Sequence, residues 1–195
     1  MRRCAFKSFL AISICEFVAA KGKERKHWLY RHRDKLKTTI RVIFGIIWLI
    51  DGLLKFSPGT AAAFPQLIQN AGSGQPDWLM PWFNFWSSVV GPNPIFWATL
   101  VGVGEMLIGI GLIVGGIRKI TYMVGMVLSL FIWAVPEGFG GPYGPGSTDI
   151  GTGIIYSLVF LCLMIINAGY GTSRYSIDAW IEKRVKWWRK LAEFG

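Results

Sequence analysis

Three ionisable side chains stand inside stretches of sequence that are otherwise apolar: Asp51, Lys55 and Glu105. Asp51 and Lys55 are spaced i, i+4, so on a helix they share a face, with the acid on the favourable N-terminal side. A charge at the centre of a bilayer costs roughly 2.5–3.5 kcal/mol on insertion scales, so such side chains face the interior of a helix bundle and find partners there. These three residues are the candidate catalytic group, suited to accepting and passing protons.

Their heights in the membrane predict which of them meet. At a rise of ~1.5 Å per residue, Lys55 lies ~21 Å and Asp51 ~15 Å above Arg41, taken as the inner boundary. Glu105, on a segment that runs the other way, lies ~20 Å above Arg118. We therefore predict a Lys55–Glu105 ion pair with Asp51 nearby. Two interpretations remain open: a buried pair that only fixes helix packing, or a polar, proton-accepting floor under a site open to the outer face.

A second candidate site is the loop Glu137–Asp149, which is rich in glycine and proline. Proline fixes φ and glycine permits φ > 0, so the loop should form tight turns. Successive glycine N–H groups can line an anion site, although the loop could equally be a lid that seals the bundle. Ser147, Thr148 or Asp149 can cap the next helix. The candidate substrate-binding residues are Lys55, Glu137, Gly140, Gly141, Tyr143 and Asp149.

The distribution of Lys and Arg predicts the elements that position these residues. They crowd into residues 2–55, recur as Arg118–Lys119 and return between Arg174 and Lys190, and none occurs in the intervening stretches. Lys and Arg collect on the cytoplasmic side of membrane proteins. Three basic islands separated by two cation-free excursions predict an all-α bundle of four transmembrane helices, with both termini on the inner side of the cell membrane.

Four apolar stretches have close to the ~20 residues that cross a bilayer. They are Thr39–Phe56, Ile95–Ile117, Ile120–Val135 and Ile150–Ala168. Between the first two lies a long outer excursion, Ser57–Pro94, in which Asp77–Trp86 should form a short helix in the outer interface. The second span is rich in glycine, which lets helix backbones approach closely, either within one bundle or across a dimer.

Two basic segments flank this domain of residues 39–170. Residues 1–38 begin with a signal-like apolar run that is too short to span, and we expect an interfacial or partner-bound helix there. In residues 171–195, the stretch Tyr175–Phe194 has helical periodicity and predicts a basic amphipathic helix. Its apolar face would carry Ile177, Trp180, Ile181, Val185, Trp188 and Leu191. This helix would lie on the inner membrane surface or dock a partner subunit.

Composition excludes several classes of function. The net charge is +10, but it lies beside the spans, so membrane lipids explain it at roughly 1 kcal/mol per basic residue, and we do not expect nucleic acid as a partner. The spans contain no histidine and the three cysteines are far apart, so neither haem nor a metal site is expected. Any electrons must pass directly between a bound donor and a membrane carrier such as a quinone. The aromatic residues that could line a quinone pocket are Trp48, Trp133, Tyr143 and Tyr156.

Three stretches resemble the DoxX/DoxD family of small four-span membrane proteins: residues 41–56, residues 104–112, and the loop Glu137–Asp149 running into Tyr156. Together they cover about residues 40–170, and the loop points to the DoxD branch. This resemblance implies a subunit of thiosulfate:quinone oxidoreductase, with quinone as cofactor. Lys55 would attract thiosulfate, the glycine loop would bind it, and Glu105 or Asp51 would handle the protons of the quinone.

One feature counts against that activity, because Lys55 is the only cation predicted near the outer face. A doubly charged substrate would then need cations from a partner subunit. The alternative is a non-catalytic accessory subunit that stabilises a larger membrane complex. A small transporter is less well supported, because the sequence shows neither a repeat nor a broken helix.

Overall fold

The computed structural model describes residues 31–143 and 149–194, and these residues form helices and connecting turns without a β-strand. A first helix covers residues 31–54. It is followed by α2 (Pro58–Gly72), η1 (Asp77–Leu79), α3 (Met80–Val90), α4 (Pro94–Val114), α5 (Arg118–Ala134), η2 (Gly138–Gly140), α6 (Thr152–Tyr170), α7 (Ile177–Ile181), η3 (Lys186–Trp188) and α8 (Arg189–Ala192). The prediction of an all-helical protein is confirmed for this part of the chain.

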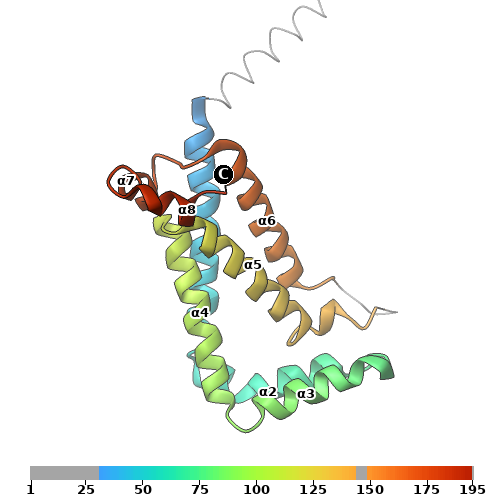
Figure 1. The fold of residues 1–195 in the computed structure, drawn as a ribbon. Helices are drawn as coiled ribbons and strands as arrows, with labels where there is room; N and C mark the ends of the chain where they lie inside the picture. The colour runs from blue at the N-terminus through green and yellow to red at the C-terminus, as the bar shows by residue number, and fades with distance from the viewer. Residues whose placement is uncertain (1–30, 144–148, 195) are drawn as a thin grey trace, which may run out of the picture.

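The four long helices run lengthwise, while α2 and α3 lie side by side across one end (Figure 1). We call this the hairpin end. The chain after α6 covers the opposite end, which we call the tail end (Figure 1). Within the described residues, α4 and α6 are long and apolar enough to cross a membrane, with mean hydropathies of 1.9 and 2.0.

Aromatic side chains fill the centre between the first helix and α6. Phe44 contacts Tyr156 and Phe160 edge-on, with ring centroids 5.4 and 4.9 Å apart, and Trp48 packs against the same two rings. Gly125 on α5 leaves room for Phe160, whose ring would lie 2.2 Å from an added Cβ. This cluster fixes the position of Trp48, which bears on the site described below.

Glycine brings the first helix and α4 into close contact. A Cβ on Gly52 or Gly102 would meet the facing backbone at about 3 Å, and the same holds for Gly45 and Gly109 one level nearer the tail end. Two of these glycines belong to the glycine-rich second span, and here they serve packing within the chain. This close approach brings Lys55 and Glu105 to the same level.

The outer excursion contains more helix than the sequence analysis predicted. The short helix expected at Asp77–Trp86 is present and extends to Val90, whereas α2 was missed. The signals for α2 were in the sequence: Ser57 caps the helix through its hydroxyl, Pro58 occupies the first turn, and Gly72 ends it. The two helices contact each other: Phe64, Ile68 and Val90 belong to one buried cluster, and Phe83 of α3 lies against Gly72 of α2.

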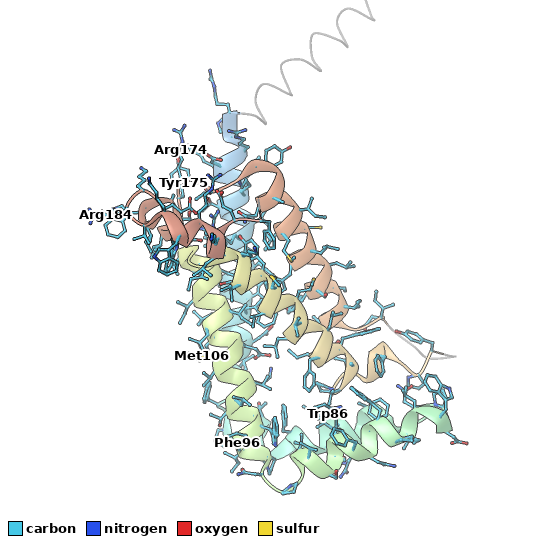
Figure 2. All side chains as sticks on the ribbon, in the orientation of Figure 1. Trp86, Phe96, Met106, Arg174, Tyr175 and Arg184 are labelled. Carbon is cyan, nitrogen blue, oxygen red and sulfur yellow. The ribbon has the colours of Figure 1, made fainter. Side chains whose placement is uncertain are left out.

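The predicted continuous amphipathic helix over Tyr175–Phe194 is wrong. The tail consists of α7, a turn, η3 and α8, and it folds back over the tail end. Helical periodicity did not identify the residue that attaches this segment to the bundle. That residue is Asp178, which is fully buried in an ion pair with Arg118. Trp180 and Trp187 remain exposed, and Figure 2 shows Arg174, Tyr175 and Arg184 at the same end.

Predictions for residues 1–30 and 144–148 lie outside the described residues. They include the interfacial helix near the N-terminus and the capping roles of Ser147 and Thr148.

Candidate functional site

The predicted ion pair is present at the hairpin end. Lys55 Nζ, at the C-terminal end of the first helix, lies 3.3 Å from Glu105 Oε2 in the middle of α4. The Lys55 side chain is 25% exposed and that of Glu105 only 4%. The contact is ionic and not a well-directed hydrogen bond, because this buried Glu105 oxygen has no hydrogen-bond partner among the described residues.

The pair forms part of the wall of a cavity of about 240 Å³, which we call the polar chamber. Asp51 lies in the same wall, and the Tyr156 hydroxyl donates to its carboxylate over 3.4 Å. The chamber is lined by Trp48, Asp51, Lys55, Glu105, Ser129, Ile132, Glu137, Thr152, Gly153 and Tyr156. The structure thus brings the three predicted catalytic residues together, and adds Ser129, Thr152 and Gly153, which the sequence analysis did not single out.

A second cavity of about 240 Å³ adjoins the first, and we call it the apolar chamber. It is lined mainly by Phe64, Leu67, Ile68, Trp86, Val90, Trp97, Val101, Phe131 and Val135. Trp86 stands on the side of α3 that faces the bundle, with its ring 4.7 Å from that of Phe131 (Figure 2). The two chambers share Lys55, Glu105, Ile132 and Glu137, so the ion pair lies at the boundary between them.

Each chamber contains a tryptophan whose indole N–H has no hydrogen-bond partner within residues 31–143 and 149–194. Trp48, only 1% exposed, lines the polar chamber, and Trp86 lines the apolar chamber. Buried indole N–H groups usually find an acceptor. Four other tryptophans in the described residues do so: Trp82, Trp97, Trp133 and Trp188. The two free donors therefore indicate where a ligand oxygen can accept a hydrogen bond.

Glu137 lines both chambers and also caps a helix. Its carboxylate accepts the N–H of Gly153 over 2.8 Å in the first turn of α6, where an anion is favoured by the helix dipole. Asp149 accepts from Gly151 just before this helix. Of the predicted capping residues, Asp149 thus lies at the helix start, but Glu137 was missed as a cap because it lies far away along the chain.

In the described part of the glycine loop, residues 137–143 and 149, the N–H groups of Gly140 and Gly141 are not free for the predicted anion site. The N–H groups of Gly140 and Gly141 already donate to the carbonyls of Glu137 and Gly138 within a tight turn. The Tyr143 hydroxyl donates to Phe139, and its side chain is largely exposed. The expectation of tight turns is met for residues 138–141, but of the predicted substrate-binding residues only Lys55 and Glu137 reach the chambers.

Of the four aromatic residues predicted to line a quinone pocket, Trp48 and Tyr156 line the polar chamber. Trp133 instead donates to the Ile150 carbonyl and packs against Phe139. Within the described residues, no group of three or more His, Cys, Asp or Glu side chains is placed to hold a metal ion.

Compared with protein-family models, curated proteins and solved structures, the chain matches none of them. The function is therefore argued from the chambers themselves. Their chemistry is clear in outline: three carboxylates and one ammonium group line a polar space, and an aromatic space of the same volume opens beside it.

Proposed function

We propose that the chain is a four-span membrane protein that binds a quinone across the two chambers, as a subunit of a quinone-linked oxidoreductase. Support for four spans comes from exposed apolar side chains on all four long helices, which in the first helix follow a charged N-terminal end. They include Ile43, Ile50, Leu53, Leu100, Leu107, Met123, Val127, Leu158 and Ile165. An apolar surface of this extent would promote aggregation in water, whereas it is the surface expected of a protein that contacts lipid. The basic islands support an orientation with the hairpin end outside.

One observation carries the ligand assignment: a polar and an apolar chamber meet at a buried ion pair. A quinone has a flat ring with two carbonyl acceptors and an apolar tail. The apolar chamber suits the tail and one face of the ring. The free N–H of Trp48 and the ammonium group of Lys55 are donors for a ring oxygen.

Under this proposal the ionisable residues manage protons. A quinone that takes up two electrons also takes up two protons to become a quinol. Glu105 lies at the boundary of the chambers, so it can hold a proton next to a ring oxygen, and Asp51 with Tyr156 continues the path on the polar side. Lys55 stabilises negative charge on the reduced ring before protonation is complete.

The DoxD resemblance suggests thiosulfate as the electron donor. Two thiosulfate ions would each lose one electron and join through a new S–S bond as tetrathionate, while the quinone takes up both electrons. The polar chamber is a poor site for this dianion, because Asp51, Glu105 and Glu137 oppose the single Lys55. We therefore assign thiosulfate to a surface outside the chamber, completed by cations of a partner subunit.

The test is thiosulfate-dependent reduction of a short-chain quinone by the protein purified from its own membranes in mild detergent. We expect reduction by the wild type and a loss of about 100-fold in rate for Glu105→Gln, the scale of a lost acid–base group. Asp77→Asn is the matched control, because Asp77 is an exposed carboxylate remote from both chambers, and its rate should be unchanged.

The competing function is a non-catalytic accessory subunit. The exposed rings of Trp180 and Trp187 on the folded tail favour it, since they offer a surface for another subunit. No quinone reduction, together with stoichiometric co-purification with a large complex, would overturn the enzyme proposal. Loss of the Glu105→Gln protein from the membrane would indicate a packing role for the ion pair.

A further inference from the structure

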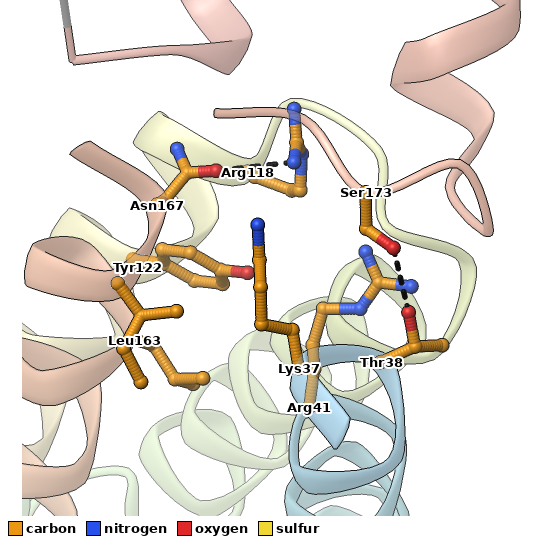
Figure 3. A pocket seen from close by; sticks show the side chains of 9 residues that line it. Lys37, Thr38, Arg41, Arg118, Tyr122, Leu163, Asn167 and Ser173 are labelled. Atoms are coloured by element: carbon orange, nitrogen blue, oxygen red, sulfur yellow. Dashed lines mark hydrogen bonds between the residues drawn. The ribbon is translucent and has the colours of Figure 1, made fainter. Parts of the chain in front are cut away.

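A small basic cavity lies at the tail end, far from the two chambers. Its wall includes Lys37, Thr38 and Arg41 of the first helix, Arg118 and Tyr122 of α5, and Ser173 after α6. Figure 3 shows the charged ends of Lys37, Arg41 and Arg118 gathered around the same space. Three cations from two helices thus face one cavity.

The charge of Arg118 is already balanced. Its guanidinium group lies 2.9 Å from Asp178 and 3.5 Å from Glu182, and it also donates to Asn167 and Thr172. Asp178 has no capacity left for the other two cations, because its carboxylate also accepts from Ile117, the Arg118 backbone and Trp188. A further counter-charge for Lys37 and Arg41 must therefore come from a group other than Asp178.

Arg41 is balanced only in part, through the Tyr122 side chain and the more distant charge of Asp178. Its side chain is 2% exposed and donates to the Tyr175 carbonyl over 2.9 Å, but Nε has no partner and no carboxylate of the described residues lies within ion-pair distance. Arginine does not lose its proton in proteins, and an isolated buried charge is costly. A buried, unpaired guanidinium that lines a cavity indicates a ligand with negative charge.

Lys37 adds a second cation to the wall of the cavity. Its ammonium group donates to the Gly171 carbonyl over 2.8 Å. Burial lowers the pKa of Lys37, and the nearby charges of Arg118, Arg33 and Arg41 lower it further, against the opposing effect of Asp34. The hydroxyls of Thr38 and Ser173, which are 2.8 Å apart, supply neutral polar groups beside it.

We propose that this cavity is a binding site for a phosphate-class oxyanion, either free phosphate or the phosphate of an anionic lipid headgroup. The centre of a water-sized particle has about 20 Å³ in which to move, which is room for one small anion and not for a larger metabolite. Arginine with lysine and hydroxyl groups is the donor set that phosphate oxygens prefer. The wall also includes the apolar side chains of Leu163 and Ile166 on α6.

The first measurement is thermal unfolding of the delipidated protein in detergent, in sodium phosphate and in sodium chloride at equal ionic strength. We expect saturable stabilisation by phosphate that is absent in Arg41→Gln and in Lys37→Gln. Arg184→Gln is the matched control, because Arg184 is exposed at the same end but lies outside the cavity, and it should respond like the wild type.

Native mass spectrometry distinguishes the two sources. If the ligand is a lipid, the gently purified wild type retains one anionic phospholipid per chain, Arg41→Gln loses it, and phosphate competes with it. If the ligand is free phosphate, no phospholipid is retained while phosphate still stabilises. The proposal is overturned if neither ligand binds the wild type, or if the variant binds like the wild type. Should Arg41→Gln fail to fold, Lys37→Gln decides by the same criteria, since Lys37 is only partly buried.

Discussion

The two ends of the bundle each contain a buried ion pair, and the pairs differ in how completely their polar atoms are satisfied. At the tail end, Arg118 and Asp178 lie 2.9 Å apart with side-chain exposures of 1% and 0%, and the Asp178 carboxylate accepts four hydrogen bonds. At the hairpin end, Lys55 and Glu105 are 3.3 Å apart, the pairing oxygen of Glu105 has no hydrogen bond, and cavities lie on both sides.

This difference separates a structural network from a site. A fully satisfied buried network rigidifies the elements it joins, and Asp178 joins the tail to the start of α5 through the N–H groups of Ile117 and Arg118. An incompletely satisfied pair beside empty space keeps bonding capacity for a ligand. The same reasoning separates Arg118 from its neighbour Arg41, whose Nε is free.

The largest effect on stability should come from the tail end. Asp178→Asn keeps the size of the side chain but leaves the Arg118 charge buried without its main partner, which costs about 3–5 kcal/mol. The measurement is the free energy of unfolding in detergent. Asp77→Asn, at an exposed carboxylate, should change it little. If Asp178→Asn lowers the free energy of unfolding no more than Asp77→Asn does, the Arg118–Asp178 pair is not a structural network, and the proposed difference between the two ends is lost.

An intermediate effect is expected at the turn between α4 and α5. Gly115 has φ +69°, and an added Cβ would lie 1.9 Å from the Arg41 guanidinium group. Gly115→Ala should therefore cost about 1–3 kcal/mol of unfolding free energy through backbone strain and displacement of Arg41. The control is Gly116→Ala at the next position, where nothing lies within 4 Å of the added Cβ. If both variants lose the same stability, the close contact with Arg41 is not the cause.

The smallest effect on stability should come from the hairpin pair. Glu105→Gln removes a carboxylate whose pairing oxygen has no hydrogen bond, and Lys55 is a quarter exposed and keeps access to the chamber. The expected change in unfolding free energy is about 1 kcal/mol or less, even though quinone reduction should fall. A loss as large as that of Asp178→Asn would make the hairpin pair a structural element like the one at the tail end.

The meeting of Lys55 with Glu105 could be predicted from the sequence, because helix rise is constant and the basic islands give the inner boundary for both spans. The four long helices could also be predicted, because each contains an apolar stretch close to the length that crosses a bilayer. Helix α2 was missed because an excursion rich in proline and glycine resembles a loop until Ser57 and Pro58 are considered as a helix start. Periodicity alone placed Asp178 off the apolar face, where a charge is expected in water.

The chambers themselves could not be predicted. They depend on where α2 and α3 fold across the bundle and bring Trp86 and Phe64 opposite Phe131 and Val135, which no local pattern encodes. The unpartnered indole N–H of Trp48 is equally a property of packing, since the sequence does not show which tryptophans find an acceptor. In the described part of the glycine loop, the N–H groups of Gly140 and Gly141 close the turn itself, which the glycine content of the sequence does not show.

The most direct test of the central claim is calorimetric titration of the purified protein with a short-chain quinone. The account predicts one quinone per chain, with affinity about tenfold weaker in Trp48→Phe, which lacks the free buried donor, a loss that corresponds to one hydrogen bond of about 1.4 kcal/mol. Trp78→Phe, at an exposed tryptophan outside both chambers, should bind like the wild type. No binding to the wild type, or equal affinity of the two variants, would contradict a quinone site at the hairpin end.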